Sequence, residues 1–120
     1  MPSFYAASFS VGDDTGNNTV LFGVENTTAN NAWHNIVGVS DATTLYIYLD
    51  GVQKNTAVRT KTGTPSISAA LAIGNWITYS AYYNGQVDDV RLYNRALTAA
   101  EVAQLYSYSD KSRGFFALSK

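Results

Sequence analysis

The stretch from residue 84 to residue 105 constrains the fold of this chain more than any other. It begins with an Asn-Gly turn, continues as a strand that carries the adjacent acids Asp88 and Asp89, and leaves through a basic and aromatic segment. Thr98 and Glu101 then form a capping box, in which each side chain can bind the other residue's backbone N–H group. The sequence therefore predicts a turn, a strand and a short capped helix, an order that few folds need.

Short strands separated by Gly, Asn and Asp turns make up most of the remaining chain. Residues 44–49 alternate most clearly, and the Asp50-Gly51 pair that follows suits a type I′ turn, since both central residues of that turn need positive φ. The pattern predicts an all-β antiparallel sandwich with the short C-terminal helix across one end. The expected strands are residues 4–11, 19–25, 32–40, 44–49, 52–58, 67–73 and 86–93, with the tail at 111–120 either one more edge strand or the start of a connection.

Length and composition restrict the classes of partner. The 120 residues suit one domain, which we place at 1–120. Charged residues make up 14% of the chain, below the usual quarter or so, and the net charge is -1. A chain with this charge has no electrostatic footprint for nucleic acid or for an anionic membrane. It also has no apolar run near the roughly 20 residues that span a bilayer, and no cysteine. We therefore expect neither nucleic acid nor membrane as a partner.

Four segments, in order, resemble the laminin-G-like branch of the concanavalin A-like lectin/glucanase superfamily. They are a Trp-His strand at residues 33–37, a Tyr-x-Asp-Gly hairpin at 45–51, a short strand ending in Gly at 71–74, and the closing motif at 85–97 with its helix. The resemblance covers about residues 19–107. It implies a jelly-roll sandwich and a binding module, because such domains are often appended to larger secreted or surface proteins. An extracellular, cell-surface or virion-surface location is the corresponding expectation.

The chain departs from that family at its beginning. Family members usually begin with further strands, including a Phe-Asp-Gly-type segment, that have no counterpart here. The fold could be a trimmed version, the chain could be a fragment, or a second copy could fill the gap. A sandwich that lacks strands exposes unpaired edges and apolar surface. We therefore expect a homo-oligomer that completes the sandwich.

An enzymatic role is not predicted. Glycosidases need two carboxyl groups about 5 Å apart, or somewhat more, which acids at i and i+2 of one strand would supply. No two acids of this chain have that spacing, and the adjacent Asp88 and Asp89 point to opposite faces of their strand. The lone histidine, His34, has no Gly-x-Ser-x-Gly elbow to accompany it, so a structural or rim position is expected. Acids that are distant in sequence could still meet in the fold.

Asp88 is the candidate metal ligand. It shares strand parity with Val90 and Leu92, which should face the core, and an unpaired buried charge is costly. Backbone amides, an arginine or calcium could compensate it. We favour a hydrogen-bonded carboxylate without metal, so no cofactor is expected apart from a structural calcium as the alternative. Asp89 should form an exposed ion pair with Arg91.

The aromatic loop at residues 75–84 is the candidate ligand-binding surface. Sugars present C–H faces that pack on aromatic rings, while their hydroxyl groups need amide or carboxylate partners. The alternative is that the rings plug the end of the sandwich, and for Trp76 and Tyr82 the two roles are equally supported. Tyr83 is expected to be a core residue. The candidate binding residues are Asn75, Trp76, Tyr79 and Tyr82.

Tyr46 and Tyr48 could form a second, flatter platform, but cross-strand packing is the better-supported role for them. The leading functional hypothesis is non-catalytic carbohydrate binding. The alternative is a structural or adhesive protein-interaction domain of a larger assembly or a virion.

Overall fold

The structure is a computed structural model that describes residues 6–13, 16–23, 32–61, 63, 71–76, 81–108 and 116–119. At positions 6, 13, 20–23, 75, 76, 81 and 116–119 only the backbone is described. In chain order the elements are β1 (Ala6–Asp13), β2 (Gly16–Gly23), β3 (Ile36–Ser40), β4 (Thr44–Leu49), β5 (Val52–Val58), β6 (Asn75–Trp76), β7 (Ala81–Tyr82), β8 (Val90–Tyr93), α1 (Ala99–Tyr108) and β9 (Phe116–Ser119).

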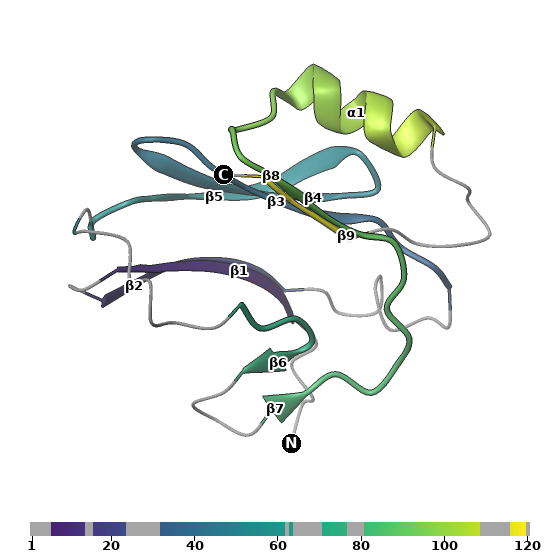
Figure 1. The fold of residues 1–120 in the computed structure, drawn as a ribbon, viewed down its shortest axis with the longest axis horizontal. Coiled ribbons are helices and arrows are strands. Elements are labelled where there is room, and N and C mark those ends of the chain that lie inside the picture. Colours follow the sequence, from purple (N-terminus) through teal and green to yellow (C-terminus); the bar gives the residue numbers. More distant parts are fainter. Residues whose placement is uncertain are drawn as a thin grey trace.

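The strands form two hairpins and one larger sheet (Figure 1). β1 pairs with β2, β6 pairs with β7, and the five-stranded sheet has the order β5-β4-β3-β9-β8. In Figure 1 the helix lies above this sheet, the β1–β2 hairpin lies below it, and the β6–β7 hairpin lies lower still. Strand pairs are antiparallel except that β9 runs parallel to both β3 and β8. Within the described residues the fold is therefore the predicted all-β sandwich with one short helix.

The β4–β5 hairpin forms as the sequence predicts. Asp50 has φ 51° and Gly51 has φ 79°, so both central residues of the turn have the positive φ that a type I′ turn requires. The pairing register shifts between Ile47 and Tyr48, and Lys54 is the extra residue of the resulting β-bulge. Among the described strands, β5 is the outer one on this side of the sheet, and the bulge interrupts its ladder.

One face of the central strands is buried under the β1–β2 hairpin. Leu45 and Ile47 of β4 are almost fully buried there, and they pack against Phe9 of β1. Asn18 of β2 fastens this layer: its Oδ1 accepts hydrogen bonds from the backbone N–H groups of Thr60 and Lys61, both at 2.9 Å, and its Nδ2 donates to the Lys61 carbonyl at 2.7 Å. The hairpin is thus held to the chain that follows β5.

The opposite face of the same strands is buried under α1. Val37, Val39 and Tyr48 pack with Leu97 and Val102 from the segment before the helix and from the helix itself. This burial confirms the packing role predicted for Tyr48, and Tyr46 packs against the same cluster. The helix lies on the face of the sheet rather than across one end, so that expectation was wrong. Its apolar stripe needs an apolar surface to cover, and the face of β3 and β4 provides one.

The capping box forms as predicted. The Thr98 N–H donates to Glu101 Oε2 at 2.8 Å, and the Glu101 N–H donates to Thr98 Oγ1 at 3.2 Å. Arg95 adds an ion pair to Glu101 at 2.8 Å, and this pair is the main reason that the pKa of Glu101 falls from 4.5 to about 2. Among the described residues, none belongs to a helix long and apolar enough to cross a membrane.

Several strand boundaries differ from the predicted ones. The strand expected at 86–93 begins only at Val90, because Asp89 has φ 53° and interrupts the extended backbone. The tail does contain a strand, β9, but it lies inside the sheet and not at an edge. Residues 71–73 are described without a strand, and residues 64–70 lie outside the described part. The segment expected to be irregular contains the short β6–β7 hairpin.

Candidate functional site

The β6–β7 hairpin brings part of the predicted binding set together. In its register Asn75 lies opposite Tyr82 and Trp76 lies opposite Ala81, and the Tyr83 N–H closes the ladder on the Gly74 carbonyl at 2.7 Å. The register therefore sets Asn75, rather than Trp76, beside Tyr82. Tyr79, the fourth predicted residue, lies outside the described residues.

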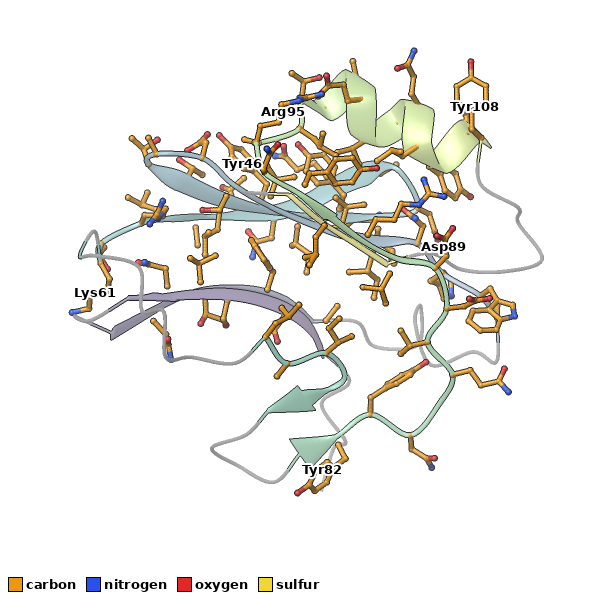
Figure 2. The ribbon with its side chains drawn as sticks, viewed as in Figure 1. Tyr46, Lys61, Tyr82, Asp89, Arg95 and Tyr108 are labelled. Carbon is orange, nitrogen blue, oxygen red and sulfur yellow. The ribbon has the colours of Figure 1, made fainter. Side chains whose placement is uncertain are left out.

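Tyr82 is a surface residue. Its side chain is 73% exposed, and Figure 2 shows it at the lower end of the molecule, away from the five-stranded sheet. A ring in this position cannot plug the end of the sandwich, so the core alternative is wrong for Tyr82. An exposed ring of this kind can stack on an apolar face of a ligand.

Tyr83 was expected in the core, and that expectation was wrong because 59% of it is exposed. Its ring instead lies over the backbone of Gly85: a Cβ added there would come within 2.5 Å of the Tyr83 Cζ and Oη atoms. Gly74 has φ 72°, and a Cβ added there would lie 3.4 Å from the Cβ of Tyr83. The absence of a side chain at position 85 thus leaves room for the exposed Tyr83 ring over the backbone. In the sequence, Gly85 stands two residues after Tyr83, and this spacing could have indicated the arrangement. Sequence analysis used Gly85 only as part of the Asn-Gly turn.

The acids before β8 do not reach the core. Asp88 is exposed, and its Oδ1 accepts a hydrogen bond from the Asp89 N–H at 2.8 Å. Asp89 forms the predicted ion pair with Arg91, with Oδ2–Nη2 at 2.9 Å and Oδ1–Nε at 3.1 Å. The Asp89 hydrogen bond is the main reason that the pKa of Arg91 is raised. Val90 and Leu92 were expected to face the core but are exposed, so the buried-edge position inferred for Asp88 was also wrong.

Asp88 was the candidate metal ligand, and its described surroundings hold few other acidic side chains. In the part of the chain that the structure describes, no group of three or more His, Cys, Asp or Glu side chains could hold a metal ion. Calcium binds six to eight oxygens, and Asp88 supplies one carboxylate that already accepts a local backbone hydrogen bond. Calcium at Asp88 stays the untested alternative to the favoured carboxylate without metal.

The remaining described carboxylates are engaged in local structure. Asp50 accepts from His34 Nδ1 at 2.8 Å and from the Asn35 N–H at 2.9 Å, so His34 ties the β4–β5 turn to the segment before β3, as a structural residue would. Asp41 accepts from the Thr43 and Thr44 N–H groups and from the Tyr46 hydroxyl, and the Thr43 bond is the largest cause of its lowered pKa. Each described carboxylate therefore has its own set of partners.

Comparisons with known proteins address the fold. A family model of the laminin-G type matches residues 4–103. Its description is "Concanavalin A-like lectin/glucanases superfamily". The match begins earlier than the resemblance expected from the sequence, and it ends before β9. Usherin from Mus musculus is 30% identical over 80 residues, which are 62% of this chain and 2% of usherin.

A solved structure is similar in fold. It is the S-layer domain-containing protein (residues 221–444) from Clostridium thermocellum ATCC 27405, with a TM-score of 0.55 and 21% identity. The likeness covers 84% of this chain and 51% of that chain. This chain thus spans about half of the solved relative and a small part of usherin.

Proposed function

Because this chain belongs to the concanavalin A-like lectin/glucanases superfamily, in its laminin-G-like branch, we propose that it is a non-catalytic module that binds carbohydrate. Its site would be the β6–β7 hairpin, whose last residue is Tyr82, together with Tyr83 directly after it. We place the module at an extracellular or surface location, because laminin-G-like domains are often parts of secreted or surface proteins. The observation that carries the proposal is the exposed ring of Tyr83, which lies over the backbone of Gly85.

A fixed and exposed ring suits sugar recognition for a physical reason. Stacking needs a flat apolar surface that stays in one orientation, since immobilising a free side chain costs about 0.5–1.5 kcal/mol on binding. The Gly85 backbone under the Tyr83 ring supports that orientation before any ligand arrives. Asn84 is exposed next to Tyr83, and an amide side chain of this kind suits hydrogen bonds with sugar hydroxyl groups.

The described acids support a non-catalytic role. Cleavage of a glycosidic bond requires two carboxyl groups directed at one bond. The described carboxylates instead bind separate local partners: Asp50 binds His34, Asp89 binds Arg91, and Glu101 binds Arg95. Binding of a sugar without cleavage of its glycosidic bonds is therefore the role that the described side chains support.

An adhesive or structural protein-interaction role is the second candidate. The observation that favours it is the exposed apolar side chains of β8, Val90 and Leu92, with Val87 before them. Apolar residues that share one strand face are a common feature of protein interfaces. This surface is separate from the aromatic hairpin, so the two roles are compatible.

A glycan array followed by titration calorimetry with any bound sugar tests carbohydrate binding. Tyr83→Ala should weaken binding at least tenfold, a loss of about 1.4 kcal/mol. Gly85→Ala should weaken it as well, because the new Cβ would displace the Tyr83 ring while leaving its chemistry intact. Tyr108→Ala is the matched control: this tyrosine is 86% exposed, and Figure 2 shows it at the opposite end of the molecule from Tyr82.

Three results would contradict the proposal: a wild-type protein that binds nothing on the array, a Tyr83→Ala variant that binds as well as wild type, or an equal loss in Tyr108→Ala. Release of reducing sugar from a bound glycan would contradict its non-catalytic part.

A further inference from the structure

One asparagine of the chain is followed directly by glycine, Asn84 by Gly85. The backbone nitrogen of a residue can attack the side-chain Cγ of the asparagine before it, because the succinimide ring that closes carries little strain. A side chain on the attacking residue crowds this nitrogen, and glycine has none. The Asn84-Gly85 pair is therefore, by its chemistry, the pair in this chain that most readily loses its side-chain amide.

The structure leaves this pair free to react. Asn84 and Gly85 are both exposed, and they lie in the loop between β7 and β8. Within the described parts of the chain, neither the Asn84 side chain nor the Gly85 N–H group has a hydrogen-bond partner. Loops of this kind move more than the elements that they connect. No described contact therefore holds the amide carbon away from the nitrogen that attacks it.

The Asp50-Gly51 pair is the natural comparison, since aspartate can close the same ring. Its carboxylate is held on both oxygens: Oδ2 accepts from His34 Nδ1 at 2.8 Å, and Oδ1 accepts from the Asn35 N–H group at 2.9 Å. The pair also forms the turn between β4 and β5, with positive φ at both residues. The fold therefore restrains this pair, while it leaves Asn84-Gly85 unrestrained.

The other described asparagines differ from Asn84 in at least one of these respects. Asn18 is buried and hydrogen-bonded through both polar atoms of its side chain. Asn55 Oδ1 accepts from the Thr56 N–H group at 2.8 Å, so the nitrogen that would attack is already bound. Asn94 is exposed, but Arg95 follows it and its side chain crowds the attacking nitrogen. Sequence and structure thus single out the same site.

We propose that Asn84 is a site of spontaneous deamidation in which water is the co-reactant. The Gly85 nitrogen forms a bond to Asn84 Cγ, the bond from Cγ to the side-chain nitrogen breaks, and ammonia leaves with the proton of the Gly85 N–H group. Water then opens the succinimide at either carbonyl, which gives aspartate or isoaspartate. No electrons are transferred, and the one new carboxylate takes the formal net charge from -1 to -2.

The product changes the surface beside Tyr83. The ring of Tyr83 lies over the Gly85 backbone, and isoaspartate adds a methylene to the main chain directly before Gly85. The backbone under the ring therefore shifts, and a carboxylate replaces the amide next to it. The modification itself holds whether or not the module binds sugar, whereas its effect on sugar binding rests on the proposed function.

Peptide mass mapping of the folded protein, aged at mildly alkaline pH, tests the assignment. Trypsin cleaves after Arg91, so Asn84 and Asn94 lie in different peptides, and Asn94 is the matched control. Asn84 should convert about tenfold faster than Asn94 or more, a difference of about 1.4 kcal/mol in activation free energy. Asn84→Gln should stay unconverted over the same period, since its longer side chain closes a larger ring much more slowly.

Labelling with a protein-isoaspartate methyltransferase separates the contribution of the fold. In the folded protein the label should appear at residue 84 and not at residue 50. In urea the Asp50-Gly51 pair loses its hydrogen bonds from His34 and Asn35, so residue 50 should then be labelled as well.

Equal conversion of Asn84 and Asn94 would overturn the proposal, and so would an Asn84→Gln variant that gains acidic forms as fast as wild type. Label at residue 50 of the folded protein, at the rate of residue 84, would overturn the role given to the fold. None of these results bears on whether the wild-type module binds sugar, which the glycan array tests separately.

Discussion

Leu45 of β4 and Leu92 of β8 are the same residue type on the same face of one sheet, yet Leu45 is fully buried and Leu92 is mostly exposed. The difference lies in the layers around them. β3 and β4 have α1 on one face and the β1–β2 hairpin on the other, and the hairpin packs under β3, β4 and β5. Alternation of apolar residues therefore selects a face, but a second layer decides whether that face is buried.

The largest expected effect compares the two leucines directly. Leu45→Ala should lower the free energy of unfolding by about 2–5 kcal/mol, because it removes a fully buried side chain and leaves a cavity. Leu92→Ala should change it by no more than about 0.5 kcal/mol, as surface substitutions usually do. Urea unfolding at low protein concentration measures both. Equal losses in the two variants would show that β8 has a cover in solution.

A second substitution tests the strand that joins the covered and exposed parts of the sheet. Ala117 of β9 lies between Val37 of β3 and Arg91 of β8 in the two parallel ladders. Ala117→Pro removes one ladder N–H group from an inner strand, and the unsatisfied acceptor should cost about 1–3 kcal/mol. Hydrogen exchange should then show faster exchange in β8 and β3 than in the β4–β5 hairpin.

Ala117→Ser keeps the N–H group and serves as the control for that substitution. If Ala117→Pro unfolds at the same urea concentration as wild type, β9 does not bridge β3 and β8.

The smallest expected effect concerns the helix on the covered face. Glu101 has its pKa lowered from 4.5 to about 2, chiefly by Arg95. A lowered pKa means that the carboxylate stabilises the folded state above pH 4.5, and that this contribution is lost as the pH falls toward 2. Wild type should therefore melt at a higher temperature than Glu101→Gln at neutral pH, and the difference should shrink as the pH approaches 2.

Melting curves of both proteins across that pH range, followed by circular dichroism, measure the effect. A difference that is constant with pH would mean that the Glu101 charge does not contribute to stability.

Local features were predictable because their causes are local. The Asp50-Gly51 turn, the β4 and β5 strands, the Thr98 capping box and the Asp89–Arg91 pair each depend on residues within a few positions of one another. The family resemblance was also visible in the sequence, because its motifs are turns, strands and a helix cap formed by neighbouring residues. The family match over residues 4–103 confirms this resemblance.

Contacts between distant residues were not predictable in this way. Nothing adjacent to Asn18 indicates that its side chain binds the backbone at residues 60 and 61. The ring of Tyr83 lies exposed over the backbone of Gly85, and it was mistaken for a core residue because its sequence context resembles a packing position.

The sequence by itself determined the strands of the central hairpin, the start of the helix and the family, since hydrogen bonding and side-chain alternation over short distances are sufficient for these. Only the tertiary structure decided that β9 lies between β3 and β8, that α1 covers a sheet face, and that Val90 and Leu92 are exposed. The physical reason is that burial depends on which layers meet, and that is set by the sum of many distant contacts rather than by the residues beside each position.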